Sequence, residues 1–286
     1  MPSVTAADGP VAVTGASGYI GAHSVIALLK RGYHVRACVT DASNPEKTEF
    51  LLALADEHPG TVSLHEANLL EDGSYDAVFK DCCAVLHVGT PMGYGGANNP
   101  QQVYDGAING VHNIVGSVRN SGTVKRLVYT SSFAAIGHPS PPGHRYTEAD
   151  WASDNREDDK NWNTENLVEK GEVGYAMAKV ECEHLVNRLA AEDGRFDAIS
   201  VCPCVVLGPL LTPVHELRGS MAVLPRPHAG RAPVPARLAG VVEHRRCPRL
   251  RRVASPHDRE RRLRERLALH ALRHRRIGRD HRDATA

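Results

Sequence analysis

Val11-Ala-Val-Thr-Gly-Ala-Ser-Gly-Tyr-Ile-Gly21 is the stretch from which the rest of the chain can be interpreted. A short apolar run stops at a glycine, glycines recur at every third residue, and an apolar helix pattern follows. Such a turn brings backbone N–H groups close to a diphosphate, and the start of the following helix favours the negative charge. The stretch predicts the strand, turn and helix of a dinucleotide-binding domain, although plain strand–helix turns also carry such glycines.

The chain continues with alternating strand and helix patterns up to about residue 217. We expect strands at residues 11–14, 34–39, 61–67, 84–89, 126–131 and 197–203. We expect helices at residues 19–30, 46–57, 74–80, 101–120 and 175–192. Strands that alternate with helices at this spacing form a parallel sheet covered on both faces. The fold class predicted for residues 1–217 is therefore α/β, a Rossmann-type doubly wound parallel sheet.

Composition bounds the class of protein. The chain has 286 residues, 42% of them apolar, which is enough for one α/β domain with a sizeable core. Seven cysteines occur without a CxxC pair and sixteen histidines without a metal-ligand spacing, so we expect buried thiols and no metal. The first ten residues do not resemble a secretory leader, and no stretch is long and apolar enough for a membrane span. These features predict a cytoplasmic protein with no membrane partner.

Two connections exceed the ordinary loop length. Residues 91–100 follow the fourth expected strand, and residues 137–174 follow the fifth, so both leave the carboxyl edge of the sheet, where ligands bind in open α/β folds. The longer connection could be a mobile surface excursion. Its two tryptophans, Trp151 and Trp162, favour a folded cap over a substrate instead.

Tyr175 and Lys179 could carry proton chemistry. They are four residues apart at the start of an expected helix, so their side chains share one face. A nearby ammonium group stabilises a phenolate and lowers the tyrosine pKa, which makes the phenol a usable proton donor. Ser131, at the end of the fifth expected strand, could hydrogen-bond the same substrate oxygen. Each feature alone is weak, but together they occur in the order that one sheet edge requires.

Three motifs resemble the signature of the extended short-chain dehydrogenases/reductases: Thr14-Gly-Ala-Ser-Gly-Tyr-Ile-Gly21, Thr130-Ser-Ser132 and Tyr175-Ala-Met-Ala-Lys179. Further phrases are similar to the dihydroflavonol reductase and cinnamoyl-CoA reductase group, namely Leu86-His-Val-Gly-Thr-Pro-Met92, Tyr146-Thr-Glu-Ala-Asp-Trp151 and Cys202-Pro-Cys-Val-Val-Leu-Gly-Pro209. The resemblance runs from about Val11 to about Gly219.

The resemblance implies roles for particular residues. Tyr175 would protonate the substrate carbonyl as hydride arrives, Lys179 would bind the nicotinamide ribose, and Ser131 would polarise the carbonyl. Asn109 would support the proton relay, and Pro203 would lie against the nicotinamide. The dinucleotide would be held by Gly15, Ser17, Gly18, Tyr19, Ile20, Gly21, Thr40, Lys47, Asn68, Leu69, Val88, Thr90, Tyr175, Lys179 and Pro203.

The residues after the second expected strand bear on the choice of cofactor. An acidic residue at the strand end would bind the ribose 2′-hydroxyl of NAD, but the strand ends at Thr40 and Asp41 comes slightly late. The resembling plant reductases hold the 2′-phosphate with an arginine where this chain has Thr40. Lys47 matches their second basic contact, whereas Arg36 is expected to face elsewhere. Asn68 replaces the usual aspartate of the adenine site. We therefore favour NADP(H) over NAD(H).

The last part of the chain differs in composition. Residues 218–286 contain nineteen arginines, no lysine and six acidic residues, a formal charge of +13, whereas residues 1–217 carry −12. Arg, Ala, Pro, His and Leu abound and aromatic residues are absent, as in GC-rich DNA translated in a wrong frame. We expect a disordered or frameshifted tail in place of a complete substrate lobe. A basic arm for nucleic acid is the disfavoured alternative, since no binding module is recognisable.

The sequence thus predicts an oxidoreductase that acts on a small-molecule carbonyl or alcohol and uses NADP(H) or NAD(H). Two alternatives remain open. One is a dinucleotide-binding protein with impaired catalysis, because one wall of its substrate pocket would be missing. The other is a sugar-nucleotide epimerase or dehydratase, since such enzymes share the Tyr/Lys chemistry. The substrate and the oligomeric state are left undetermined.

Overall fold

The computed structural model describes residues 4–90, 100–137, 142–152 and 172–217, which all lie in one compact unit. Its centre is a six-stranded sheet in the order β3-β2-β1-β4-β5-β6. The strands are β1 (Val11–Thr14), β2 (His34–Val39), β3 (Thr61–Glu66), β4 (Ala84–His87), β5 (Arg126–Thr130) and β6 (Asp197–Val201). Every neighbouring pair is parallel. The predicted Rossmann-type sheet is confirmed.

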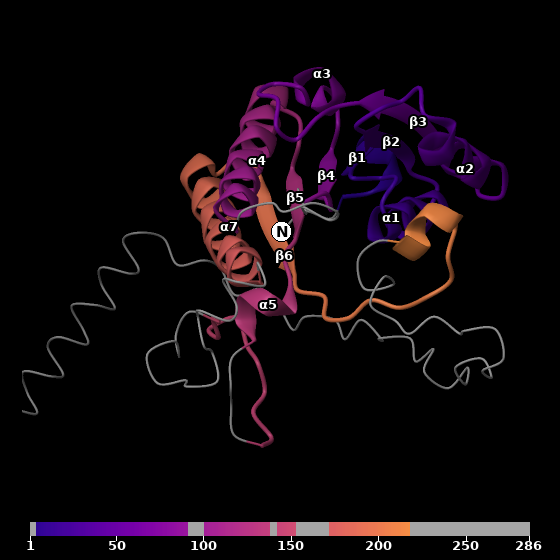
Figure 1. Cartoon of the computed structure of the whole chain (residues 1–286). Coiled ribbons are helices and arrows are strands. Elements are labelled where there is room, and N and C mark those ends of the chain that lie inside the picture. The colour runs from indigo at the N-terminus through magenta and orange to yellow at the C-terminus, as the bar shows by residue number, and fades with distance from the viewer. Residues whose placement is uncertain (1–3, 91–99, 138–141, 153–171, 218–286) are drawn as a thin grey trace, which may run out of the picture. The chain divides into compact units, whose positions relative to one another are not determined.

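Helices connect the strands and cover both faces of the sheet (Figure 1). They are α1 (Tyr19–Leu29), α2 (Pro45–Asp56), α3 (Asp76–Phe79), α4 (Pro100–Ser121), α5 (Phe133–Ile136) and α7 (Glu172–Asp193), with short 3-10 turns η1 (Ala6–Asp8) and η2 (Pro213–Leu217). Helices α4 and α7 pack against each other on one face, and α1 and α2 lie on the other.

Side chains that alternate along the central strands build two separate cores. Ala12 of β1 and Val85 of β4 pack toward α4 and α7, whereas Val13 and Leu86, the next residue of each strand, pack toward α1 and α2. Successive side chains of a strand point to opposite faces of the sheet, so both faces of a central strand must be apolar. This explains why the first three residues of β1 and of β4 are all apolar.

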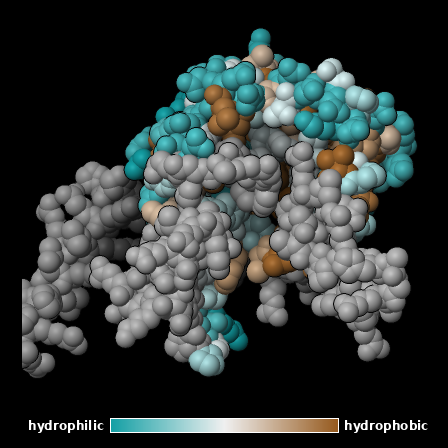
Figure 2. Space-filling view, viewed as in Figure 1, coloured by the Kyte–Doolittle hydropathy of each residue, from teal (hydrophilic) through white to brown (hydrophobic). Residues whose placement is uncertain are grey.

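Large apolar side chains are mostly enclosed in these layers. Over the described residues visible in Figure 2, hydrophilic side chains dominate around α2, β3 and α3, and apolar ones appear in small separate groups. Leu70, which is 62% exposed, and Leu52, which is 46% exposed, are among the exceptions. No helix among the described residues is both long and apolar enough to cross a membrane.

The helix boundaries differ from the expected ones after β5. Helix α5 forms directly after the strand, in residues to which the sequence pattern assigned no element, and the Ser132 side chain accepts a hydrogen bond from Ala134 N to cap it. Helix α7 begins at Glu172, inside the expected connection. Part of that connection is folded, because the Trp151 ring stacks on His184 with centroids 3.8 Å apart and Ala152 N donates to Ala135 O. Trp162 and residues 91–99 and 218–286 lie outside the described residues.

Candidate active site at the carboxyl edge of the sheet

The glycine turn between β1 and α1 is closely packed against the end of β4. Gly15 has φ +62°, and a Cβ built on it would lie 2.7 Å from Gly89 Cα, so no larger residue fits without movement. A Cβ on Gly21 would overlap the Gly15 carbonyl oxygen. The first N–H groups of α1 have no acceptor inside the helix, and they follow this turn directly. Close backbone and open N–H groups together fit a diphosphate.

Thr14 connects the turn to the loop after β4. Its Oγ1 accepts hydrogen bonds from Val88 N and Gly89 N, both at 3.2 Å, and lies 2.8 Å from His87 Nδ1. A hydroxyl that accepts twice has one hydrogen left to donate, so it donates to His87 Nδ1 and the His87 proton is on Nε2. Burial, followed by the charge of Lys179, lowers the pKa of His87 to about 3. His87 is therefore a neutral imidazole within the site.

Lys179 lies at the centre of the predicted catalytic group. Its side chain is buried, and Nζ donates to Thr90 Oγ1 at 2.9 Å and to the Thr130 carbonyl at 2.8 Å. Nζ lies 5.7 Å from the centroid of the Tyr175 ring, so the two predicted residues share one face of α7. Burial lowers the pKa of Lys179 to about 8. This ammonium group can lose its proton near neutral pH.

Ser131 lies next to this group at the end of β5. Its side chain is 2% exposed, and its backbone N–H donates to the Tyr129 carbonyl, which bends the chain toward α5. Pro203, just after β6, is held against this bend because its carbonyl accepts from Phe133 N at 2.8 Å. The register that pairs Thr130 with Val201 explains the proximity. The predicted Ser131 and Pro203 therefore lie at the same sheet edge as Lys179.

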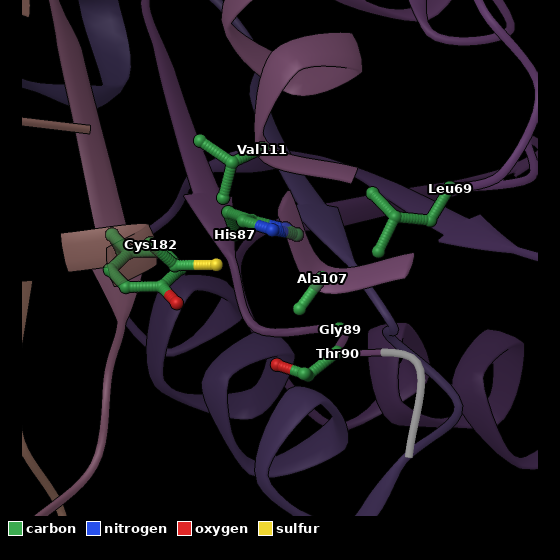
Figure 3. A pocket seen from close by; sticks show the side chains of 8 residues that line it. Leu69, His87, Gly89, Thr90, Ala107, Val111 and Cys182 are labelled. Atoms are coloured by element: carbon green, nitrogen blue, oxygen red, sulfur yellow. The ribbon is translucent and has the colours of Figure 1, made fainter. Parts of the chain in front are cut away.

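A small pocket opens between β4, α4 and α7 (Figure 3). The figure shows that the Thr90 hydroxyl, the His87 ring and the Cys182 thiol face a common space. Leu69 and Thr90 were predicted here. Six lining residues were not predicted, which are His87, Gly89, Ala107, Val111, Tyr129 and Cys182. Two of them, His87 and Gly89, belong to the motif at residues 86–92, and a buried histidine at a strand end looks like a core residue.

The predicted adenosine end lies at the ends of β2 and β3. Thr40 is exposed directly after β2, and Lys47 is half-buried in the first turn of α2. The Asp41 carboxylate accepts from Ser43 N at 3.0 Å and Ser43 Oγ at 2.7 Å, bonds that lower its pKa and tie it to its own loop. Arg36 faces elsewhere, as predicted, because it donates to the Val78 and Lys80 carbonyls.

The remaining residues that were predicted to bind the dinucleotide make different contacts. Ser17 and Tyr19 contact His215, which the sequence analysis did not single out. Val88 uses its backbone N–H toward Thr14 and packs its side chain on the α1 and α2 core. Asn68 is engaged within its own loop, since its Nδ2 donates to Glu71 Oε1 and its Oδ1 accepts from Leu70 N.

Asn109 is not brought to the Tyr175 and Lys179 group. It is exposed and shares a hollow with Leu70, Asp72 and His112. On α4 it lies about 200° around the helix from Ala107, which lines the pocket. The proton-relay role that the resemblance implied for Asn109 has no geometric support here.

The nearby Asn113 has a structural function that the sequence analysis missed. It is buried, its Oδ1 accepts from Gly73 N at 3.1 Å, and its Nδ2 donates to the Leu69 and Glu71 carbonyls at 3.2 and 2.5 Å. These bonds fasten the loop after β3 to α4 and so position Leu69 in the pocket.

Comparison with known proteins identifies relatives over the same part of the chain. The profile of the NAD dependent epimerase/dehydratase family matches residues 11–231. The chain is 35% identical over 210 residues to a dihydroflavonol 4-reductase of Hordeum vulgare, which covers 71% of this chain and 55% of the relative. It is 35% identical over 206 residues to a cinnamoyl-CoA reductase of Medicago truncatula, which covers 71% and 60%. The match thus spans little more than half of these relatives.

Solved structures support the fold. Vestitone reductase from alfalfa (Medicago sativa) has a TM-score of 0.56 at 24% identity, covering 74% of this chain and 61% of that one. Yeast methylglyoxal/isovaleraldehyde reductase complexed with NADPH has a TM-score of 0.56 at 25% identity, covering 70% and 59%. Both are reductases with the same arrangement of sheet and helices over the shared part.

Proposed function

The chain belongs to the NAD dependent epimerase/dehydratase family, and on this premise we propose that it is an NADP(H)-dependent oxidoreductase of the extended short-chain type that interconverts a carbonyl group and an alcohol on a small molecule. The observation that carries the proposal is the position of Lys179. It is buried, shares a helix face with Tyr175, and is bonded to the end of β5 beside Ser131.

The residues at this edge fit a dinucleotide. The turn at Gly15 leaves no side chain between the backbone and a diphosphate, and the first turn of α1 offers its N–H groups. Lys179 would bind the nicotinamide ribose, and Thr40 and Lys47 would face the adenosine ribose. The bound cofactor supplies or accepts a hydride at its nicotinamide ring.

The protein residues would manage the proton and the carbonyl oxygen. In reduction, the Tyr175 hydroxyl gives its proton to the oxygen, which becomes the alcohol; in oxidation, it takes that proton back. The Lys179 ammonium stabilises the phenolate that forms. The Ser131 hydroxyl donates a hydrogen bond to the same oxygen and polarises it.

Four observations support NADP(H). The residue at the end of β2 is Thr40, which brings no negative charge to repel a 2′-phosphate. Asp41 is turned into its own loop by Ser43. Lys47 lies in the first turn of α2, where its charge can reach the ribose. The related yeast reductase was solved with NADPH.

Turnover by the purified full chain tests the proposal. A panel of aldehydes and ketones is offered with NADPH and separately with NADH, and loss of the reduced nicotinamide is followed by absorbance. We expect carbonyl-dependent oxidation of NADPH, reduced about a hundredfold or more by Tyr175→Phe. Tyr33→Phe removes a hydroxyl that bonds the Val4 carbonyl instead, so it serves as the control.

Other results would contradict the proposal. NADPH binding with no oxidation by any carbonyl would favour the dinucleotide-binding protein without catalysis. Isomerisation of a sugar nucleotide with no net oxidation of cofactor would favour an epimerase. Clearly faster turnover with NADH would overturn the cofactor assignment alone.

A further inference from the structure

The chain that follows β6 contacts the glycine turn near the start of the sequence. Residues 208–215, called the return segment below, contact α1 repeatedly. A Cβ on Gly208 would lie 2.8 Å from the Tyr19 hydroxyl, so backbone and ring are close there. His23 Nε2 donates to the Pro209 carbonyl at 3.0 Å, and Leu211 packs on the core beneath α1 and α2.

His215 is the most deeply buried contact of the return segment. It has no exposed surface, and its ring meets the Tyr19 ring edge-on with centroids 5.7 Å apart and the Phe50 ring at 5.5 Å. Its Nε2 lies 3.1 Å from the Ser17 carbonyl oxygen. Because a carbonyl only accepts, Nε2 carries the proton and donates.

This bond completes the fixing of one peptide unit in the turn. The Ser17 carbonyl and the Gly18 N–H belong to the same planar peptide, and Gly18 N donates to the Gly15 carbonyl at 3.0 Å. The peptide is therefore held at both polar ends, directly before the first N–H groups of α1. Rotation of this peptide would turn its carbonyl oxygen toward the space that a diphosphate needs.

We propose that His215 is a positioning residue for dinucleotide binding: it holds the Ser17–Gly18 peptide so that the turn presents N–H groups, and not a carbonyl, to the diphosphate. The inference rests on the proposed function, because it assigns the turn to a dinucleotide. It adds that the far end of the described chain sets the geometry of the turn. Tyr19 and Phe50 orient the His215 ring, and the Ser17 carbonyl accepts its hydrogen bond.

Two substitutions separate the hydrogen bond from the packing. His215→Leu keeps an apolar side chain between Tyr19 and Phe50 but cannot donate. His215→Gln keeps an N–H donor at a similar reach. His58→Leu is the control, because His58 follows α2 at the opposite, amino edge of the sheet.

The first measurement is the dissociation constant of NADPH, taken on the full chain by the fluorescence of the reduced nicotinamide. We expect His215→Leu to weaken binding about fivefold to tenfold, the effect of losing one buried hydrogen bond. His215→Gln stays within about twofold of the unchanged chain, and so does His58→Leu. The second measurement is amide hydrogen exchange of residues 17–22 without ligand, which speeds up in His215→Leu alone.

The outcomes are distinguishable. If His215→Leu binds NADPH as tightly as the unchanged chain, or if His215→Gln is as weak as His215→Leu, the positioning role is wrong. If the unchanged chain binds neither NADPH nor NADH, the proposed function fails instead. The exchange measurement then still decides whether His215 holds the turn, because unchanged exchange in His215→Leu would overturn the contact itself.

Discussion

His87 lies where three parts of the site meet. Its Nδ1 is fixed by Thr14, its ring is tilted against the Tyr129 ring with centroids 5.7 Å apart, and the positive charge of Lys179 acts on it. A second positive charge here would oppose the charge on Lys179. The neutral state of His87 therefore leaves the positive charge on Lys179, which bonds the pocket residue Thr90.

This state has a consequence for stability. The pKa of His87 is about 3 in the folded chain and about 6.5 in an unfolded one. Between these values the unfolded chain binds a proton that the folded chain does not, so stability falls as the pH falls. Between about pH 7 and about pH 5, His87 should remove about 2 kcal/mol of unfolding free energy. We expect His87→Gln to lose this part of the acid sensitivity in thermal or urea unfolding; an unchanged slope would contradict the assignment.

Titration of Lys179 should lower the activity as the pH rises, whereas titration of His87 lowers the stability as the pH falls. Its pKa is lowered to about 8, so its ammonium charge is lost as the pH rises through that value. Without the charge, the Tyr175 phenolate is less stabilised, and kcat/KM for carbonyl reduction should fall. Lys179→Arg keeps the charge at all these pH values and should move the fall to higher pH, although at a lower rate. A profile that stays flat beyond about pH 10 would exclude this role.

Some residues of the site could be predicted from the sequence. Lys179 shares a helix face with Tyr175 and bonds the Thr130 carbonyl beside Ser131, because motif spacing and strand ends determine which residues reach one sheet edge. Asn109 and Asn113 are four residues apart on α4, and the sequence pattern does not show that Asn113 is buried and Asn109 exposed. Which of two helix asparagines is buried depends on the partner loop, and the partner carbonyls of Leu69 and Glu71 carry no side-chain signal.

Asn113 matters for the loop that follows β3. Asn113→Ala leaves the Gly73 N–H and two carbonyls without their partner, so we expect a loss of about 2 to 3 kcal/mol of unfolding free energy. Asn120→Ala, on the same helix, removes one exposed bond to Asp76 and should cost less than about 1 kcal/mol. If both variants lost the same unfolding free energy in urea, burial of the Asn113 hydrogen bonds would add nothing to stability.

Alanine substitutions at two glycines test the packing of the turn and of α4. Gly15→Ala places a methyl group against Gly89 at positive φ, so it should destabilise the chain by about 1 to 3 kcal/mol and weaken NADPH binding. Gly116 lies inside α4 with no atom near a built Cβ, so Gly116→Ala should stabilise by about 0.5 to 1 kcal/mol. Both are measured by thermal unfolding, and the same sign for both would contradict the packing described.

Strands and helices that are bounded by turn-forming residues were predicted well. Each expected strand lay between turn residues, and the helix expected at residues 101–120 had apolar residues on one side. Helix α5 was missed because its four residues, Phe133–Ile136, are too few to show a helical period. It exists because it packs on α7 and because Ser132 caps it, and both reasons require the folded chain.

At the scale of the whole molecule, the strand order explains where the site lies. Chain connections run outward in both directions from the adjacent strands β1 and β4, so a crevice forms at their carboxyl ends. Thr14 and His87 bridge these two strands, and the predicted residues from β2, β5 and β6 reach the same edge.

A dinucleotide in this crevice should stabilise the entire sheet. At about 100 times its dissociation constant, NADPH should raise the unfolding free energy by about 2.7 kcal/mol, and NADH at the same concentration by less. Lys47→Ala should reduce the NADPH shift toward that of NADH. Lys30→Ala, at the end of α1, leaves both shifts unchanged. Equal thermal shifts with the two dinucleotides in the unchanged chain would mean that the 2′-phosphate is not recognised.

The Thr14–His87 bond joins residues 73 positions apart, and this separation bears on how the chain folds. Strand β1 finds β2 as the next strand along the chain, but its other side stays open until β4 has been synthesised. A central strand with one unpaired apolar edge can pair wrongly with another chain. Because such non-local parallel pairing is slow, nascent chains of this protein should depend on chaperones most while β4 is still missing.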